Sequence, residues 1–149
     1  MENNVIISIQ GRQSYEQAEE ETIELVTEGC LQPDGAEGYT LSYQESELTG
    51  LEGTLTTFQI EPERITLMRV GEFNSQMVFQ EGRRHMSMYN TPYGAMTIGV
   101  NTRHLLSELT DRGGEIEIDY AIEIDHSVAG RNTFQINVKE AEGAVSLQA

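Results

Sequence analysis

The sequence predicts an all-β protein, an antiparallel up-and-down closed β-barrel of about eight to ten strands. Apolar and polar residues alternate in almost every segment, with the period of two that is typical of strands. Turn-forming Gly, Pro, Asp and Asn residues separate these segments at the spacing of antiparallel hairpins. No segment has the periodicity of a long amphipathic helix.

The clearest alternation lies in residues 115–125, EIEIDYAIEID. One face of this segment is apolar, and the other carries all of its acidic residues, as in a strand with one buried face and one solvent-exposed face. The apolar face holds Ile116, Ile118, Tyr120, Ile122 and Ile124. Nine other runs also predict strands: residues 5–9, 23–25, 38–44, 55–60, 64–70, 75–80, 84–89, 94–100 and 131–140.

Two segments need separate interpretation. Residues 16–26, EQAEEETIELV, resemble a helix start but continue into β-branched alternation, so we expect a strand that begins at Glu19 to Glu21. Residues 103–109, RHLLSEL, fit either a strand with a bulge or a single helical turn.

Turn residues divide the chain into hairpins. Pro33-Asp34-Gly35, Glu61-Pro62-Glu63, Gly71 to Asn74, Glu81-Gly82 and Asp111 to Gly114 are turn candidates, and Asn90 to Gly94 (NTPYG) predicts a hairpin corner. Strands with one apolar face bury it in a barrel or in a sandwich. The hairpin order favours the barrel, because closure removes the exposed edge strands.

Length and charge restrict the function. The chain has 149 residues, and we expect one barrel domain over residues 1–141 and a C-terminal tail over 142–149. The net charge of −16 argues against nucleic acids and anionic membranes as partners. Cys30 is the single cysteine, and neither a signal peptide nor a membrane-spanning run is evident, so we expect a cytoplasmic protein.

Several motifs together resemble a known family. They are TGLEGT (49–54), LMRVG (67–71), NSQMVFQEG (74–82), YNTPYG (89–94), GGEIEIDYAIEID (113–125) and NTFQINV (132–138). In this order they resemble the YwiB-like family of small bacterial proteins of unknown function, which have a calycin, or lipocalin-like, β-barrel. The resemblance implies a barrel around a central lumen, as in calycins that bind small apolar ligands.

The lumen is the candidate binding site. Five of the six methionines lie between residues 68 and 96, and flexible methionine side chains line either an adaptable pocket or a filled core. Candidate residues at the lumen or its mouth are Arg69, Met77, Phe79, Met86, Met88, Tyr93, Met96 and Tyr120. A small apolar or anionic ligand fits this set.

Arg69 is the most informative of these candidates. In the alternation of this strand, Arg69 points to the same face as Ile65 and Leu67. Met68 and Val70 point to the opposite face. If Ile65 and Leu67 face inward, Arg69 does too, and a buried guanidinium needs an internal carboxylate or an anionic ligand. We therefore predict that Arg69 points into the lumen or its mouth. The alternative is an exposed Arg69 paired with a neighbouring strand.

No motif indicates catalysis. His85, His104 and His126 lack the spacing of a metal site, so we expect neither a metal nor another cofactor, and we assign no catalytic residue. His85 shares a face with Ser87 and Tyr89, opposite Met86 and Met88, and we expect the histidine face to point outward. The leading hypothesis is a ligand-binding barrel. The alternatives are an assembly module with a filled core and an acidic surface, which would allow an oligomer, and a hydrolase.

Overall fold

The computed structural model describes residues 3–15, 20–35, 38–45, 52–71, 74–91, 94–124 and 127–141, apart from the side chains of residues 3, 15 and 88–91. These residues form ten strands. They are β1 (Asn3–Tyr15), β2 (Glu21–Asp34), β3 (Gly38–Gln44), β4 (Leu55–Ile60), β5 (Ile65–Val70), β6 (Ser75–Phe79), β7 (Arg84–Thr91), β8 (Gly94–Thr110), β9 (Gly113–Ile124) and β10 (Ser127–Glu140).

Each strand pairs with its neighbours in sequence, and β1 pairs with β10 to close the barrel. All the pairs are antiparallel, so the predicted all-β, up-and-down barrel is confirmed. The contact between β6 and β7 is the sparsest, with the single backbone pair Ser75 and Tyr89. The wall is therefore nearly, but not uniformly, closed.

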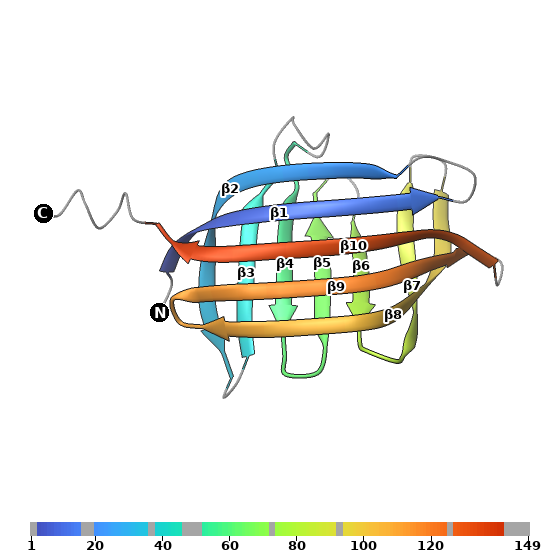
Figure 1. The fold of residues 1–149 in the computed structure, drawn as a ribbon. Helices are drawn as coiled ribbons and strands as arrows, with labels where there is room; N and C mark the ends of the chain where they lie inside the picture. The colour runs from blue at the N-terminus through green and yellow to red at the C-terminus, as the bar shows by residue number, and fades with distance from the viewer. Residues whose placement is uncertain are drawn as a thin grey trace, which may run out of the picture.

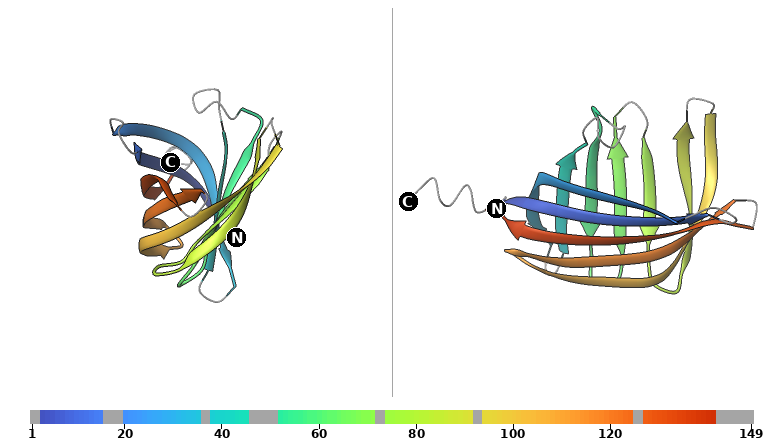
Figure 2. Two further views of the ribbon diagram at one scale, coloured as in Figure 1. Left: turned by 90° about the vertical axis from the view of Figure 1, so that its right-hand side faces the viewer. Right: turned by 45° about the horizontal axis from the view of Figure 1, so that its top comes forward.

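The barrel is flattened into two layers. Figure 1 shows β1, β9 and β10 running across the view, in front of the shorter strands β3 to β6, which run nearly perpendicular to them. Figure 2 shows the two layers facing each other. The flanking strands β2 and β8 are long, and β8 extends over 17 residues. The five long strands, β1, β2, β8, β9 and β10, are longer than the runs that predicted them.

Segment 103–109 belongs to β8, and the register shifts between Thr102 and His104. Of the two interpretations that the sequence left open, the strand with a bulge is correct. The extra residue shifts the alternation of β8, so Thr102 and Leu105 both have partners on the inward face of β9.

Two predicted turns show the expected geometry. Gly35 and Gly82 both have positive φ, 76° and 74°, which glycine adopts without steric cost. The NTPYG segment joins β7 to β8. The backbone pair of this hairpin nearest the turn is Thr91 with Gly94, as a tight hairpin requires. Pro92 and Tyr93 themselves lie outside the described residues, as does the predicted tail over 142–149.

One end of the barrel interior is densely packed. The largest side chains there are fully buried and come from both layers, among them Ile7, Phe58, Ile65, Ile116 and Ile136. Ile116 and Ile136 are direct cross-strand partners on β9 and β10. Such pairs are the unit of sheet stabilisation, so this end contributes strongly to the hydrophobic stability of the fold.

Candidate functional site

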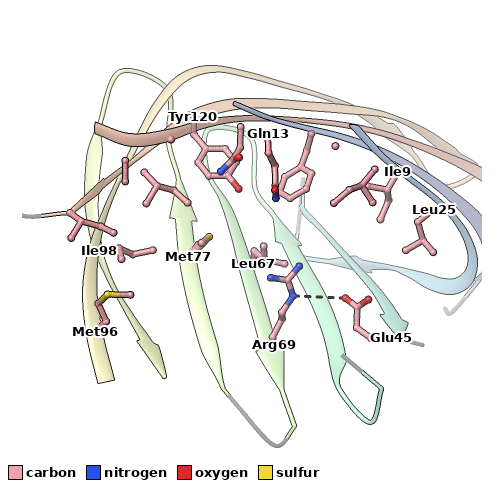
Figure 3. A pocket seen from close by; sticks show the side chains of 18 of the residues that line it. Ile9, Gln13, Leu25, Glu45, Leu67, Arg69, Met77, Met96, Ile98 and Tyr120 are labelled. Carbon is pink, nitrogen blue, oxygen red and sulfur yellow. Dashed lines mark ion pairs between the residues drawn. The ribbon is translucent and has the colours of Figure 1, made fainter. Parts of the chain in front are cut away.

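The other end of the barrel contains a half-open cavity of about 590 Å³. Its walls come from both layers, and Figure 3 shows their side chains converging on a common space. Most of the lining is apolar: Ile9, Ile23, Leu25, Leu67, Met77, Met96, Ile98, Ile122, Ile124 and Phe134. This size and composition are typical of pockets for small molecules.

Small residues at inward positions leave this space unfilled. Gly11 on β1 and Gly130 on β10 line the cavity together with Ala129. Gly11 continues the inward alternation of Val5, Ile7 and Ile9 but has no side chain to extend into the lumen. The glycine in the run VIISIQG is therefore the sequence signal that could have indicated a hollow rather than a filled barrel.

Arg69 lies in the wall of this cavity, at the end of β5. Its side chain is 24% exposed, and its Nε lies 3.8 Å from Oε2 of Glu45, whose side chain is 1% exposed (Figure 3). This separation is too long for a hydrogen bond, and Nε has no hydrogen-bond acceptor among the described residues. The contact is therefore a charge pair between a buried carboxylate and a partly exposed guanidinium whose Nε–H is unsatisfied.

Glu45 is held by neighbouring side chains of the same layer. Thr56 donates a hydrogen bond from Oγ1 to Oε2 of Glu45, at 2.5 Å. Burial raises the pKa of the Tyr43 phenol well above its usual range, and the negative charge of Glu45 raises it further, so Tyr43 stays protonated. The sequence analysis missed Glu45, although it continues the inward parity of Leu41 and Tyr43.

The wall opposite Arg69 also carries polar side chains. Gln13, Asn132 and Tyr120 line the cavity from β1, β10 and β9 and are consecutive cross-strand partners. Asn132 is 6% exposed, and its Oδ1 has no hydrogen-bond partner in the described part of the chain. The Tyr120 ring packs on Phe79 and Phe134, with centroid separations of 4.7 and 5.9 Å, so its position is fixed by aromatic contacts.

Comparisons with known proteins show the family. The model of a "Domain of unknown function (DUF1934)" matches residues 7–136. The chain belongs to the DUF1934 family. The DUF1934 match runs from β1 into β10 and so includes every strand that lines the cavity. None of the curated proteins matches the chain.

A solved structure has the same fold as this DUF1934 chain. The crystal structure of ywiB protein from Bacillus subtilis matches with a TM-score of 0.83 over 94% of this chain and 93% of that chain. The two sequences are 19% identical, so the comparison concerns the fold. The resemblance to the YwiB-like family is confirmed by both findings.

Four of the eight predicted lumen residues line the cavity of the DUF1934 barrel: Arg69, Met77, Met96 and Tyr120. Phe79 faces inward as predicted, but it is fully buried in contact with Tyr120 and does not line this cavity. Tyr93 and the side chain of Met88 lie outside the described part of the chain.

The prediction for Met86 is wrong. Met86 is 58% exposed, because β7 has the opposite orientation to the predicted one. Its neighbours His85 and Ser87 pair with the buried residues Val100 and Ile98 of β8, and direct partners share a face. The histidine face therefore points inward, where His85 Nε2 lies 3.0 Å from Gln80 Oε1.

Charges on the outer wall are paired across strands. Arg84 reaches Glu123 at 2.6 Å, and Arg103 reaches Asp119 at 2.6 Å. Among the cavity-lining residues, by contrast, Arg69 and Glu45 are the charged pair. The described residues contain no cluster of three or more His, Cys, Asp or Glu side chains arranged to hold a metal ion. Within the same residues, no helix is long and apolar enough to cross a membrane.

Proposed function

We propose that this protein binds a small, largely apolar molecule in the barrel cavity and that a polar group of the ligand contacts Arg69. The observation that carries the proposal is the cavity of about 590 Å³, whose wall is apolar except for a few converging polar groups. Binding sites for small molecules combine these two properties, since apolar walls supply affinity and a few polar groups fix the orientation.

The unsatisfied N–H of Arg69 supports a role in ligand binding. A buried donor without an acceptor destabilises the free protein, and a ligand oxygen at Arg69 would relieve that cost on binding. The hollow interior also favours a binding role over an assembly module with a filled core. We further propose that binding occurs in the cytoplasm, because the single cysteine, Cys30, forms no internal disulfide.

A bulky substitution inside the cavity tests this proposal. Leu25 lines the cavity, whereas the next residue, Val26, is exposed on the outer wall. We expect Leu25→Trp to weaken binding of the apolar dye anilinonaphthalene sulfonate at least about tenfold, because the indole occupies the ligand space. Fluorescence titration of the wild-type protein and both variants measures this, with thermal denaturation to verify folding.

Val26→Trp is the matched control, with the same new side chain one residue away and on the opposite face. It should bind the dye as the wild-type protein does. Equal dye affinities in all three folded proteins would contradict binding in the cavity, as would a loss of affinity confined to Val26→Trp.

A further inference from the structure

Two rows of polar side chains cross the otherwise apolar cavity on facing walls. The Arg69 row consists of the direct cross-strand neighbours Tyr43, Thr56 and Arg69 on β3, β4 and β5. The Asn132 row consists of Gln13, Asn132, Tyr120 and Thr102 on β1, β10, β9 and β8. Figure 3 shows Arg69 on one wall, with Gln13 and Tyr120 on the wall across from it.

Each row contains a buried polar atom without a hydrogen-bond partner among the described residues. In the Arg69 row it is the guanidinium Nε, and in the Asn132 row it is Oδ1 of Asn132. Oγ1 of Thr102 is also unpartnered there, but Thr102 does not line the cavity. Asn132 is 6% exposed and lines the cavity. Buried polar groups in native proteins are nearly always satisfied, so unsatisfied atoms on both walls of one pocket indicate a ligand with two separate polar groups.

The chemistry of each row restricts the group that it receives. Arg69 only donates hydrogen bonds, so it selects an acceptor such as a carboxylate or carbonyl oxygen. The carboxamide of Asn132 both donates and accepts, and a hydroxyl group complements it in either orientation. A ligand with several negative charges is disfavoured, because Glu45 already neutralises Arg69 and the chain carries a net charge of −16.

We propose that the ligand is a hydroxylated carboxylic acid with a largely apolar skeleton. This inference rests on the proposed function, since it specifies the molecule that the cavity receives. The carboxylate accepts hydrogen bonds from Arg69, and the hydroxyl lies at the Asn132 row. Apolar parts of the skeleton contact Ile9 and Leu67 on one side of the rows and Met96 and Ile122 on the other.

Three simple probes separate the two polar contacts: decanol, decanoate and ω-hydroxydecanoate, each titrated calorimetrically against the wild-type protein. We expect decanoate to bind about tenfold more tightly than decanol, because the carboxylate forms charge-assisted hydrogen bonds with Arg69. We expect ω-hydroxydecanoate to bind about fivefold more tightly than decanoate, because the hydroxyl satisfies Asn132.

Two variants assign these preferences to their residues. Asn132→Leu should abolish the advantage of ω-hydroxydecanoate over decanoate, whereas Asn137→Leu, on the outer face of the same strand, should retain it. Arg69→Met combined with Glu45→Gln removes both charges of the pair together, so that no buried charge is left unpaired, and should abolish the advantage of decanoate over decanol.

The outcomes distinguish this inference from the proposed function. Equal binding of decanoate and ω-hydroxydecanoate by the wild-type protein overturns the inference but leaves cavity binding intact. A hydroxyl preference that persists in Asn132→Leu also overturns it. If none of the three probes binds to the wild-type protein, and dye binding is insensitive to Leu25→Trp, the proposed function fails as well. Because the affinities of the wild-type protein for decanoate and ω-hydroxydecanoate are compared directly, the inference can be overturned even if a variant does not fold.

Discussion

The two halves of the barrel interior follow the same alternation of residues, yet one half is packed and the other is hollow. In the packed half, the inward positions carry large side chains such as Phe58, Ile65 and Ile116. In the hollow half, Gly11, Gly130 and Ala129, which lies at a register shift of β10, line the interior, and a cavity of about 590 Å³ remains. Alternation therefore determines which residues face the interior, whereas side-chain volume along each strand determines where the interior is open.

This difference predicts that the same Ile→Ala substitution lowers the free energy of unfolding by different amounts at two positions of β9. Ile116 is fully buried in the packed half, and Ile122, of the same parity, lines the cavity. Ile116→Ala should lower the free energy of unfolding by about 4 kcal/mol, because it removes contacts and creates a new void. Ile122→Ala should cost about 1 kcal/mol, because it enlarges an existing space. Chemical denaturation measures both, and similar costs would mean that both halves are packed alike.

The charge pairs show a related contrast between the interior and the outer wall. Arg69→Met should lower the free energy of unfolding by about 3 kcal/mol, because it removes the cation that faces the buried carboxylate of Glu45. Arg84→Met, on the outer wall, should cost less than about 1 kcal/mol, because its pair with Glu123 is partly exposed.

Adding Glu45→Gln to Arg69→Met should restore most of the lost stability, since the buried negative charge is then absent. Denaturant titrations of the single and double variants test this, and adding Glu45→Gln to Arg84→Met serves as a control for the second substitution. A double variant no more stable than Arg69→Met alone would show that Arg69 stabilises the fold by packing rather than by charge.

Much of the fold could be predicted from the sequence, because hydrophobic alternation and turn residues act locally. The inward face of β9 and the orientation of Arg69 both followed from parity. Glu45 was missed because a carboxylate was not expected to continue an inward face, although it pairs with Arg69 from another strand. Pairing of this kind depends on tertiary contact, which one sequence does not display.

The error on β7 has a specific physical origin. Met86 and Met88 appeared to define an apolar inward face, but the register of β7 on β8 places the polar Ser87 beside Ile98 and leaves Met86 exposed. Side-chain polarity alone gave the wrong face, because the pairing of the hairpin fixes orientation for the whole strand. Phe79 faces inward as predicted, but local sequence could not show that it is fully buried against Tyr120 rather than part of the cavity lining.

The most direct test is a crystal structure with ω-bromododecanoate, whose bromine is located by anomalous scattering. We predict an anomalous peak within the cavity, among residues such as Met77, Ile98 and Ile122, with the carboxylate at Arg69. A cavity without ligand density, together with bromine peaks confined to exposed patches such as that around Met86 or Val70, would contradict the account.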